Sequence, residues 1–183
     1  MGSHLWWYTA RASGVVAWAL VTASVLWGLA LASRLVRRPK PPWVLDVHRF
    51  LGGASVVFVA VHVVALSLDP YIGFGPADLL VPMASPWKPG AVAWGIVALY
   101  LLVAVEVTSL MMRKLPRKLW RAVHLTSFVV FGATAVHAIE AGSDFGDAAL
   151  QWFGLVAVGL VAFLGLFRAL ADRRAPVRRA TAP

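Results

Sequence analysis

Four histidines lie in two apolar stretches of the sequence at nearly the same spacing. His48 and His62 are 14 residues apart, and His124 and His137 are 13 residues apart. Imidazole nitrogens bind transition metals and haem iron. Two pairs at matching spacing favour two separate metal sites, each with one ligand from either stretch. The fifth histidine, His4, lies outside both stretches, and we give it no role.

Each of the two stretches is long enough to cross a bilayer as a helix. Residues 50–68 carry no charge, and a spanning helix needs about 20 apolar residues. The whole chain is 60% hydrophobic and only 14% charged, whereas soluble proteins contain about 25% charged residues. The composition therefore predicts an integral membrane protein with one domain.

The apolar pattern predicts an all-α bundle of five transmembrane helices, with haems between the second and fourth. Asp46 is the expected N-cap of the second helix. Residues 69–89 contain five prolines and form the longest loop, which we expect to lie against the membrane surface or over the helix ends. The haem domain should cover residues 1–170, followed by a basic cytoplasmic tail, 171–183. The helices are expected at about 12–34, 46–68, 90–112, 119–139 and 148–168.

The positive charges predict how the chain crosses the membrane. Fifteen of the 17 lysines and arginines fall within 34–49, 113–121 and 168–179, and only Arg11 and Lys88 lie on the other side. Basic loops stay in the cytoplasm. We therefore expect a multi-pass protein of the plasma membrane with its N-terminus outside and its C-terminus inside. This segregation also accounts for the net charge of +9 without nucleic acid as a partner.

The chain contains no cysteine. This excludes thiolate metal ligands, iron–sulfur clusters and the covalent attachment of c-type haem. Any haem must therefore be held without covalent attachment, and we expect haem b.

The helices at 46–68 and 119–139 should run in the same direction, so their histidines pair by depth. His48 and His124 form an inner pair, and His62 and His137 form an outer pair. At 1.5 Å per residue the two levels are about 20 Å apart, which suits two stacked haems with bis-histidine ligation. His48 and His62 share a helix face, whereas a spacing of 13 leaves His124 and His137 misaligned on an ideal helix. Tighter winding or ligands approaching from different directions would resolve this, and both remain open.

Residues near the inner pair have the chemistry to hold the rest of a haem. Gly52 lies one turn beyond His48, where a missing side chain admits a flat ring. Haem propionates are anionic and pair with arginine. The arginines flanking the inner pair are Arg49, Arg113, Arg117 and Arg121, which serve equally as the orientation signal.

Two local patterns resemble the ferric reductase-like transmembrane domain. They are His48-Arg49-x-x-Gly52 with His62, and Trp120-Arg121-x-x-His124 with His137. That superfamily includes ferric reductases, NADPH oxidases and the haem-binding membrane subunit of the methionine-sulfoxide reductase system, and the resemblance covers about residues 12–170. It implies an inner haem on the inner pair and an outer haem on the outer pair. Unlike the oxidases, this sequence lacks the cytoplasmic flavin and NADPH domains, which implies a separate flavin reductase carrying FAD or FMN.

The leading functional hypothesis is an oxidoreductase component. It would move electrons from a cytoplasmic reduced flavin or flavoprotein through the two haems to ferric iron, oxygen or a partner reductase outside. One alternative is a quinol-linked cytochrome in which Glu106, the single charge within residues 90–112, accepts a proton. The other is a transporter whose histidines bind a non-haem metal or relay protons.

Overall fold

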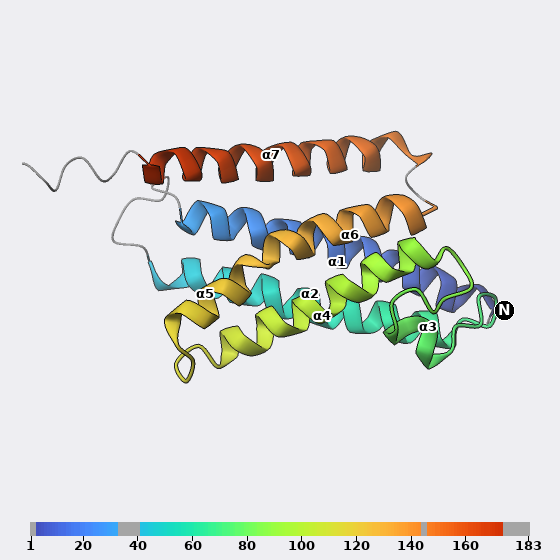
Figure 1. Ribbon diagram of the computed structural model, residues 1–183. Coiled ribbons are helices and arrows are strands. Elements are labelled where there is room, and N and C mark those ends of the chain that lie inside the picture. Colours follow the sequence, from blue (N-terminus) through green and yellow to red (C-terminus); the bar gives the residue numbers. More distant parts are fainter. Residues whose placement is uncertain (1–2, 33–40, 144–145, 174–183) are drawn as a thin grey trace, which may run out of the picture.

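The computed structural model describes residues 3–32, 41–143 and 146–173, in which the regular secondary structure is entirely helical (Figure 1). Five helical stretches of this part are long and apolar enough to span a membrane, which confirms the expected all-helical membrane architecture. The fourth of these stretches consists of two helices in succession. The helices are α1 (Ser3–Ala32), α2 (Pro42–Leu68), α3 (Pro76–Leu80), α4 (Pro89–Leu110), α5 (Arg117–Leu125), α6 (Ser127–Ala141) and α7 (Ala148–Arg173).

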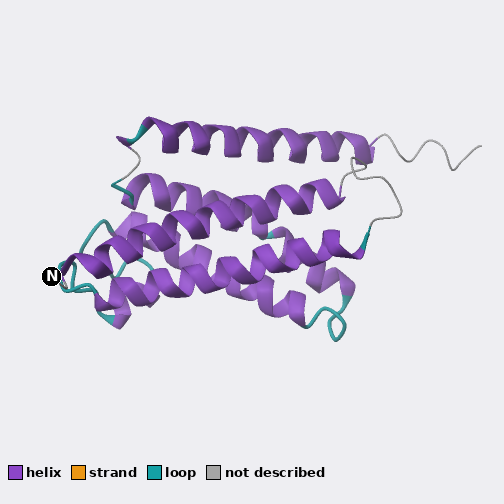
Figure 2. Cartoon of the chain, turned by 180° about the vertical axis from the view of Figure 1, so that it is seen from behind, coloured by secondary structure: helices purple, strands orange, loops and turns teal. Residues whose placement is uncertain are grey.

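The spanning helices run side by side, with α7 along the outside of the other four (Figures 1 and 2). Helix α1 packs along α2, α4 packs along α6, and α7 packs on α1. Their common core joins residues of α1, α4, α6 and α7. Its buried members are Val21, Val25, Leu29, Leu102, Val130, Phe131, Ala157 and Val161. Large apolar side chains also cover the outside of the bundle, for example Val64 and Phe163, as a lipid-facing surface requires.

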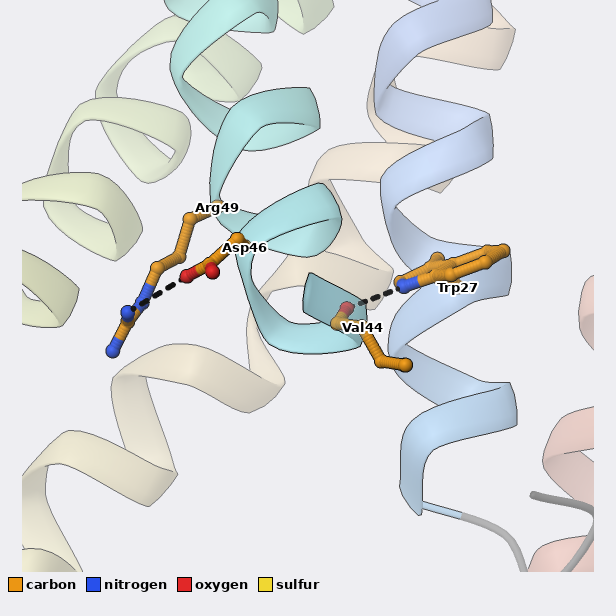
Figure 3. Close-up of polar contacts among 4 residues, drawn as sticks. All are labelled: Trp27, Val44, Asp46 and Arg49. Carbon is orange, nitrogen blue, oxygen red and sulfur yellow. Dashed lines mark hydrogen bonds and ion pairs between the residues drawn. The ribbon is translucent and has the colours of Figure 1, made fainter. Parts of the chain in front are cut away.

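Helix α2 begins earlier than the sequence pattern predicts. Pro42 occupies its first position, where proline costs no hydrogen bond. The prediction that Asp46 caps the helix is therefore wrong, because Asp46 lies inside the first turns and pairs with Arg49 at 3.3 Å (Figure 3). The indole Nε1 of Trp27 donates to the Val44 carbonyl at 2.8 Å, which joins the end of α1 to the start of α2.

Other predicted boundaries also shift. Helix α1 begins at Ser3 rather than at residue 12, because the aromatic residues 6–8 are part of the helix. The last helix continues to Arg173, and the remainder of the expected basic tail lies outside the described residues. So do residues 33–40, which contain four of the expected cytoplasmic charges.

The loop between α2 and α4 covers the ends of these helices. Phe74 and Leu79 of this loop form a buried cluster with Val92 and Ile96 of α4. Two hydrogen bonds fasten it further. Tyr100 donates its hydroxyl to the Leu80 carbonyl at 2.6 Å, and Lys88 donates its Nζ to the Glu140 carbonyl at 2.7 Å. These contacts place the loop over the helix ends, which is one of the two positions expected for it.

The fourth span is interrupted at Thr126. The backbone N–H of Thr126 bonds to the Val123 carbonyl at 3.0 Å, which is the i to i+3 pattern of a tighter 3₁₀ turn. The α-helical pattern resumes where the backbone N–H of Val130 donates to the Thr126 carbonyl at 2.9 Å. The break therefore separates α5, which carries His124, from α6, which carries His137.

Candidate functional site

The four membrane histidines form two pairs across the bundle. The ring centroids of His48 in α2 and His124 in α5 are 6.0 Å apart, and those of His62 in α2 and His137 in α6 are 6.3 Å apart. All four side chains are partly shielded by the surrounding helices. The structure thus brings together the same two pairs that depth in the membrane predicts.

These separations suit two imidazoles that bind one metal ion from opposite sides. Metal–imidazole bonds of about 2.0 Å on either side of an ion put the ring centroids roughly 6 Å apart. Helix α2 carries one histidine of each pair, and its partners lie on α5 and α6. Helix α2 makes few direct contacts with α5 or α6, whereas α2 packs closely on α1, and α6 packs closely on α4. The two imidazoles of each pair are therefore the kind of ligands, at a suitable separation, that a bis-histidine haem iron takes.

The outer pair is anchored by backbone carbonyls. Nδ1 of His62 lies 2.7 Å from the Ala10 carbonyl oxygen, and Nδ1 of His137 lies 2.7 Å from that of Ala91. A carbonyl oxygen only accepts hydrogen bonds, so each Nδ1 must carry the proton. In the neutral ring this leaves the Nε2 lone pair for a metal, which is the usual arrangement of metal-binding histidines.

Serine hydroxyls contact the inner pair at longer range. Ser24 Oγ is 3.5 Å from Nδ1 of His48, and Ser109 Oγ is 3.4 Å from Nδ1 of His124. The ring of Trp120 stacks on His124 with centroids 5.1 Å apart and an angle of 26° between the planes. Helix α4 and the first turn of α5 thus hold His124 from two sides.

A cavity lies beside the inner pair, and both polar and apolar side chains line it. Glu106 of α4 reaches across it to Gly52 of α2, where a Cβ added to the glycine would overlap the carboxylate. The group that lies against Gly52 is therefore Glu106, and the expected role of Gly52 beside a flat ring stays a prediction. The polar residues that line the cavity are Ser24, His48, Ser55, Glu106, His124 and Ser127.

The arginines predicted to bind propionates lie at the same end of the bundle as the inner pair. Arg49 is exposed and its guanidinium is turned to Asp46 (Figure 3). Arg113, Arg117 and Arg121 are exposed on and just before α5. Together with Lys114 and Lys118 they form a group of exposed positive charges at this end, which we call the cationic rim.

Glycines of the neighbouring helices contact three of the four histidines, and the sequence reasoning missed them. A Cβ added to Gly14 would lie 3.0 Å from Nδ1 of His62, and one added to Gly28 would lie 3.1 Å from Cε1 of His48. One added to Gly95 would lie 2.8 Å from Nδ1 of His137. A signal was available, because Gly14 and Gly28 have the same 14-residue spacing as the histidines of α2.

Within the described ranges, no three histidine, aspartate or glutamate side chains come close enough to hold a metal ion by themselves. Each histidine pair thus offers two protein ligands at its level. A porphyrin needs no more than two, because its own nitrogens supply the other four positions around iron.

One comparison with known proteins gives a match. The family described as ferric reductase like transmembrane component matches residues 13–135, which is more than half of the chain. The matched range contains His48, His62 and His124 and ends two residues before His137. Neither a curated protein nor a solved structure matches the chain.

Proposed function

The chain belongs to the family of ferric reductase-like transmembrane components, and on that premise we propose that it is a transmembrane b-type cytochrome with two haems. The family indicates a membrane electron-transfer component and typically binds haem. When bound, haem supplies an iron that alternates between the ferric and ferrous states. The protein's own contribution is to bind, orient and insulate the two groups.

The observation that carries this proposal is the pairing of histidines at two levels. Each pair has the separation that a shared metal requires. In the outer pair, hydrogen bonds to carbonyls leave Nε2 free to bind. Under this proposal His48 and His124 hold the inner haem, and His62 and His137 hold the outer haem, about 20 Å apart along α2. Residues 1–170 then form the haem domain.

The cationic rim supports the proposed direction of electron flow. Basic loops face the cytoplasm, so the inner haem would lie on the cytoplasmic side of the plasma membrane. Arg49, Arg113, Arg117 and Arg121 would bind its propionates or attract an anionic reduced flavin, and Gly52 would admit the edge of the ring. Electrons would come from a separate flavoprotein with FAD or FMN and leave to ferric iron, oxygen or a partner reductase outside.

A quinol-linked variant remains the second candidate, and the position of Glu106 favours keeping it. Its carboxylate lies in the cavity beside the inner pair rather than among the basic residues of the rim. Charged groups within a membrane usually mark a pathway. In this variant Glu106 accepts a proton when a quinol is oxidised at the inner level.

Reduction in sided proteoliposomes separates the two candidates. Reduced flavin added to the basic side should reduce the protein faster than flavin added to the other side, and rising ionic strength should slow this step, because salt screens the rim. Trapped ferric chelate on the far side should then be reduced. Equal rates from both sides, or salt-independent reduction by a quinol analogue that Glu106→Gln abolishes, would favour the quinol variant.

A further inference from the structure

A short pattern recurs opposite three of the four membrane histidines. In each case a small residue is followed four positions later by a glycine: Ala10 and Gly14, Ser24 and Gly28, Ala91 and Gly95. The small residue supplies the group that meets Nδ1 of the facing histidine, and the glycine supplies the surface on which the ring rests. Small residues spaced by four let membrane helices approach closely.

The helix itself explains why the glycine stands at this position. In an α-helix the carbonyl of residue i points to residue i+4, whose N–H it accepts. The Cβ of residue i+4 would normally screen that oxygen. Because Gly14 and Gly95 have no Cβ, the rings of His62 and His137 reach the carbonyls of Ala10 and Ala91, each of which has a second lone pair to offer.

We propose that Gly14, Gly28 and Gly95 are positioning residues that form seats for the imidazole rings. Each seat fixes the rotation of one ring and lets its Nδ1 bond to the neighbouring helix. This directs Nε2 toward the partner histidine, which lies on α5 at the inner level and on α6 at the outer level. The seats are specific to a level, because Gly14 and Gly95 act at the outer pair and Gly28 acts at the inner pair. This inference rests on the proposed haem binding.

Replacing each of these glycines with alanine should affect the proposed haem site at one level and leave the other level unchanged. Gly14→Ala brings a Cβ within 3.0 Å of His62, and Gly95→Ala brings one within 2.8 Å of His137, so both rings must move off their carbonyls. Loss of such supporting bonds costs about 10–100-fold in metal affinity. Gly28→Ala places its Cβ 3.1 Å from His48 at the other level. Gly53→Ala on α2 and Gly132→Ala on α6 are matched controls, because a Cβ there meets nothing within 4 Å.

The experiment compares these five variants with the wild-type chain after identical purification. The readouts are the number of haems per chain and the low-spin electron paramagnetic resonance signals, with the outer signal identified as the one that His62→Ala removes. Gly14→Ala and Gly95→Ala should lose or shift the outer signal alone. Gly28→Ala should change the inner signal alone, and both control variants should match the wild type.

Two results would contradict the proposal that these glycines position the imidazole rings. One is that Gly14→Ala changes both signals together, which would indicate a general packing defect of α1, since Gly28 lies on the same helix. The other is that the seat variants behave like the controls. Both are distinct from a wild-type chain that binds no haem, which would contradict the proposed function itself.

Discussion

His62 and His137 face each other with their ring centroids 6.3 Å apart and their planes at 83°. On an ideal straight helix, the 13-residue spacing between His124 and His137 would turn one of them away from its partner on α2. The tight turn at Thr126 breaks the fourth span between these two histidines. On either side of this turn, α5 presents His124 to His48 of α2, and α6 presents His137 to His62.

The outer pair can be tested by removing one ligand. His62→Ala leaves the inner pair unchanged and takes one of two imidazoles from the outer level. The variant should retain about half of the wild-type haem, because two axial ligands hold each group. His48→Ala is the matched variant at the inner level. It should lose the inner haem and keep the outer one. Loss of all haem from His62→Ala would show that the two levels are not independent.

The junction between α1 and α2 should contribute measurably to stability. Trp27→Phe keeps an aromatic ring but removes the N–H that donates to the Val44 carbonyl at 2.8 Å. A hydrogen bond of this kind contributes about 0.5–1.5 kcal/mol, so thermal unfolding in detergent should begin a few degrees lower. Trp152→Phe is the control, because Trp152 lies on α7 with 67% of its surface exposed. Equal melting temperatures for both variants would contradict this role.

Membrane orientation can be tested because the chain contains no cysteine. Tyr71, in the loop between α2 and α4, is 87% exposed, and Lys118 on α5 is also exposed. Tyr71→Cys should be labelled by an impermeant thiol reagent in intact cells. Lys118→Cys should be labelled only after the cells are opened, because basic segments face the cytoplasm. Labelling of Lys118→Cys in intact cells would mean that the orientation is inverted.

Much of the fold can be predicted from the sequence, because long apolar stretches identify membrane helices. The pairing by depth of His48 with His124 and of His62 with His137 also follows, since depth depends only on position along each span. The predicted cap at Asp46 is wrong because Pro42 already provides a favourable start one turn earlier.

The details that escaped prediction depend on contacts between helices. The sequence left the winding of the fourth span open, and only the packed bundle shows the turn at Thr126. The spacing of Gly14 and Gly28 gave a signal, but Gly95 looks like an ordinary small residue until α4 is placed beside His137. Glu106 could be recognised as unusual in an apolar helix, but its contact with Gly52 of α2 is a property of the assembled structure.

Under the proposed function, each of the two histidine pairs holds one haem b. A pyridine haemochrome assay on the purified full-length chain, with protein determined by amino-acid analysis, tests it most directly. We expect two haems per chain in the wild type and none when His48, His62, His124 and His137 are all replaced by alanine. One haem per wild-type chain, or haem that survives the fourfold replacement, would contradict it.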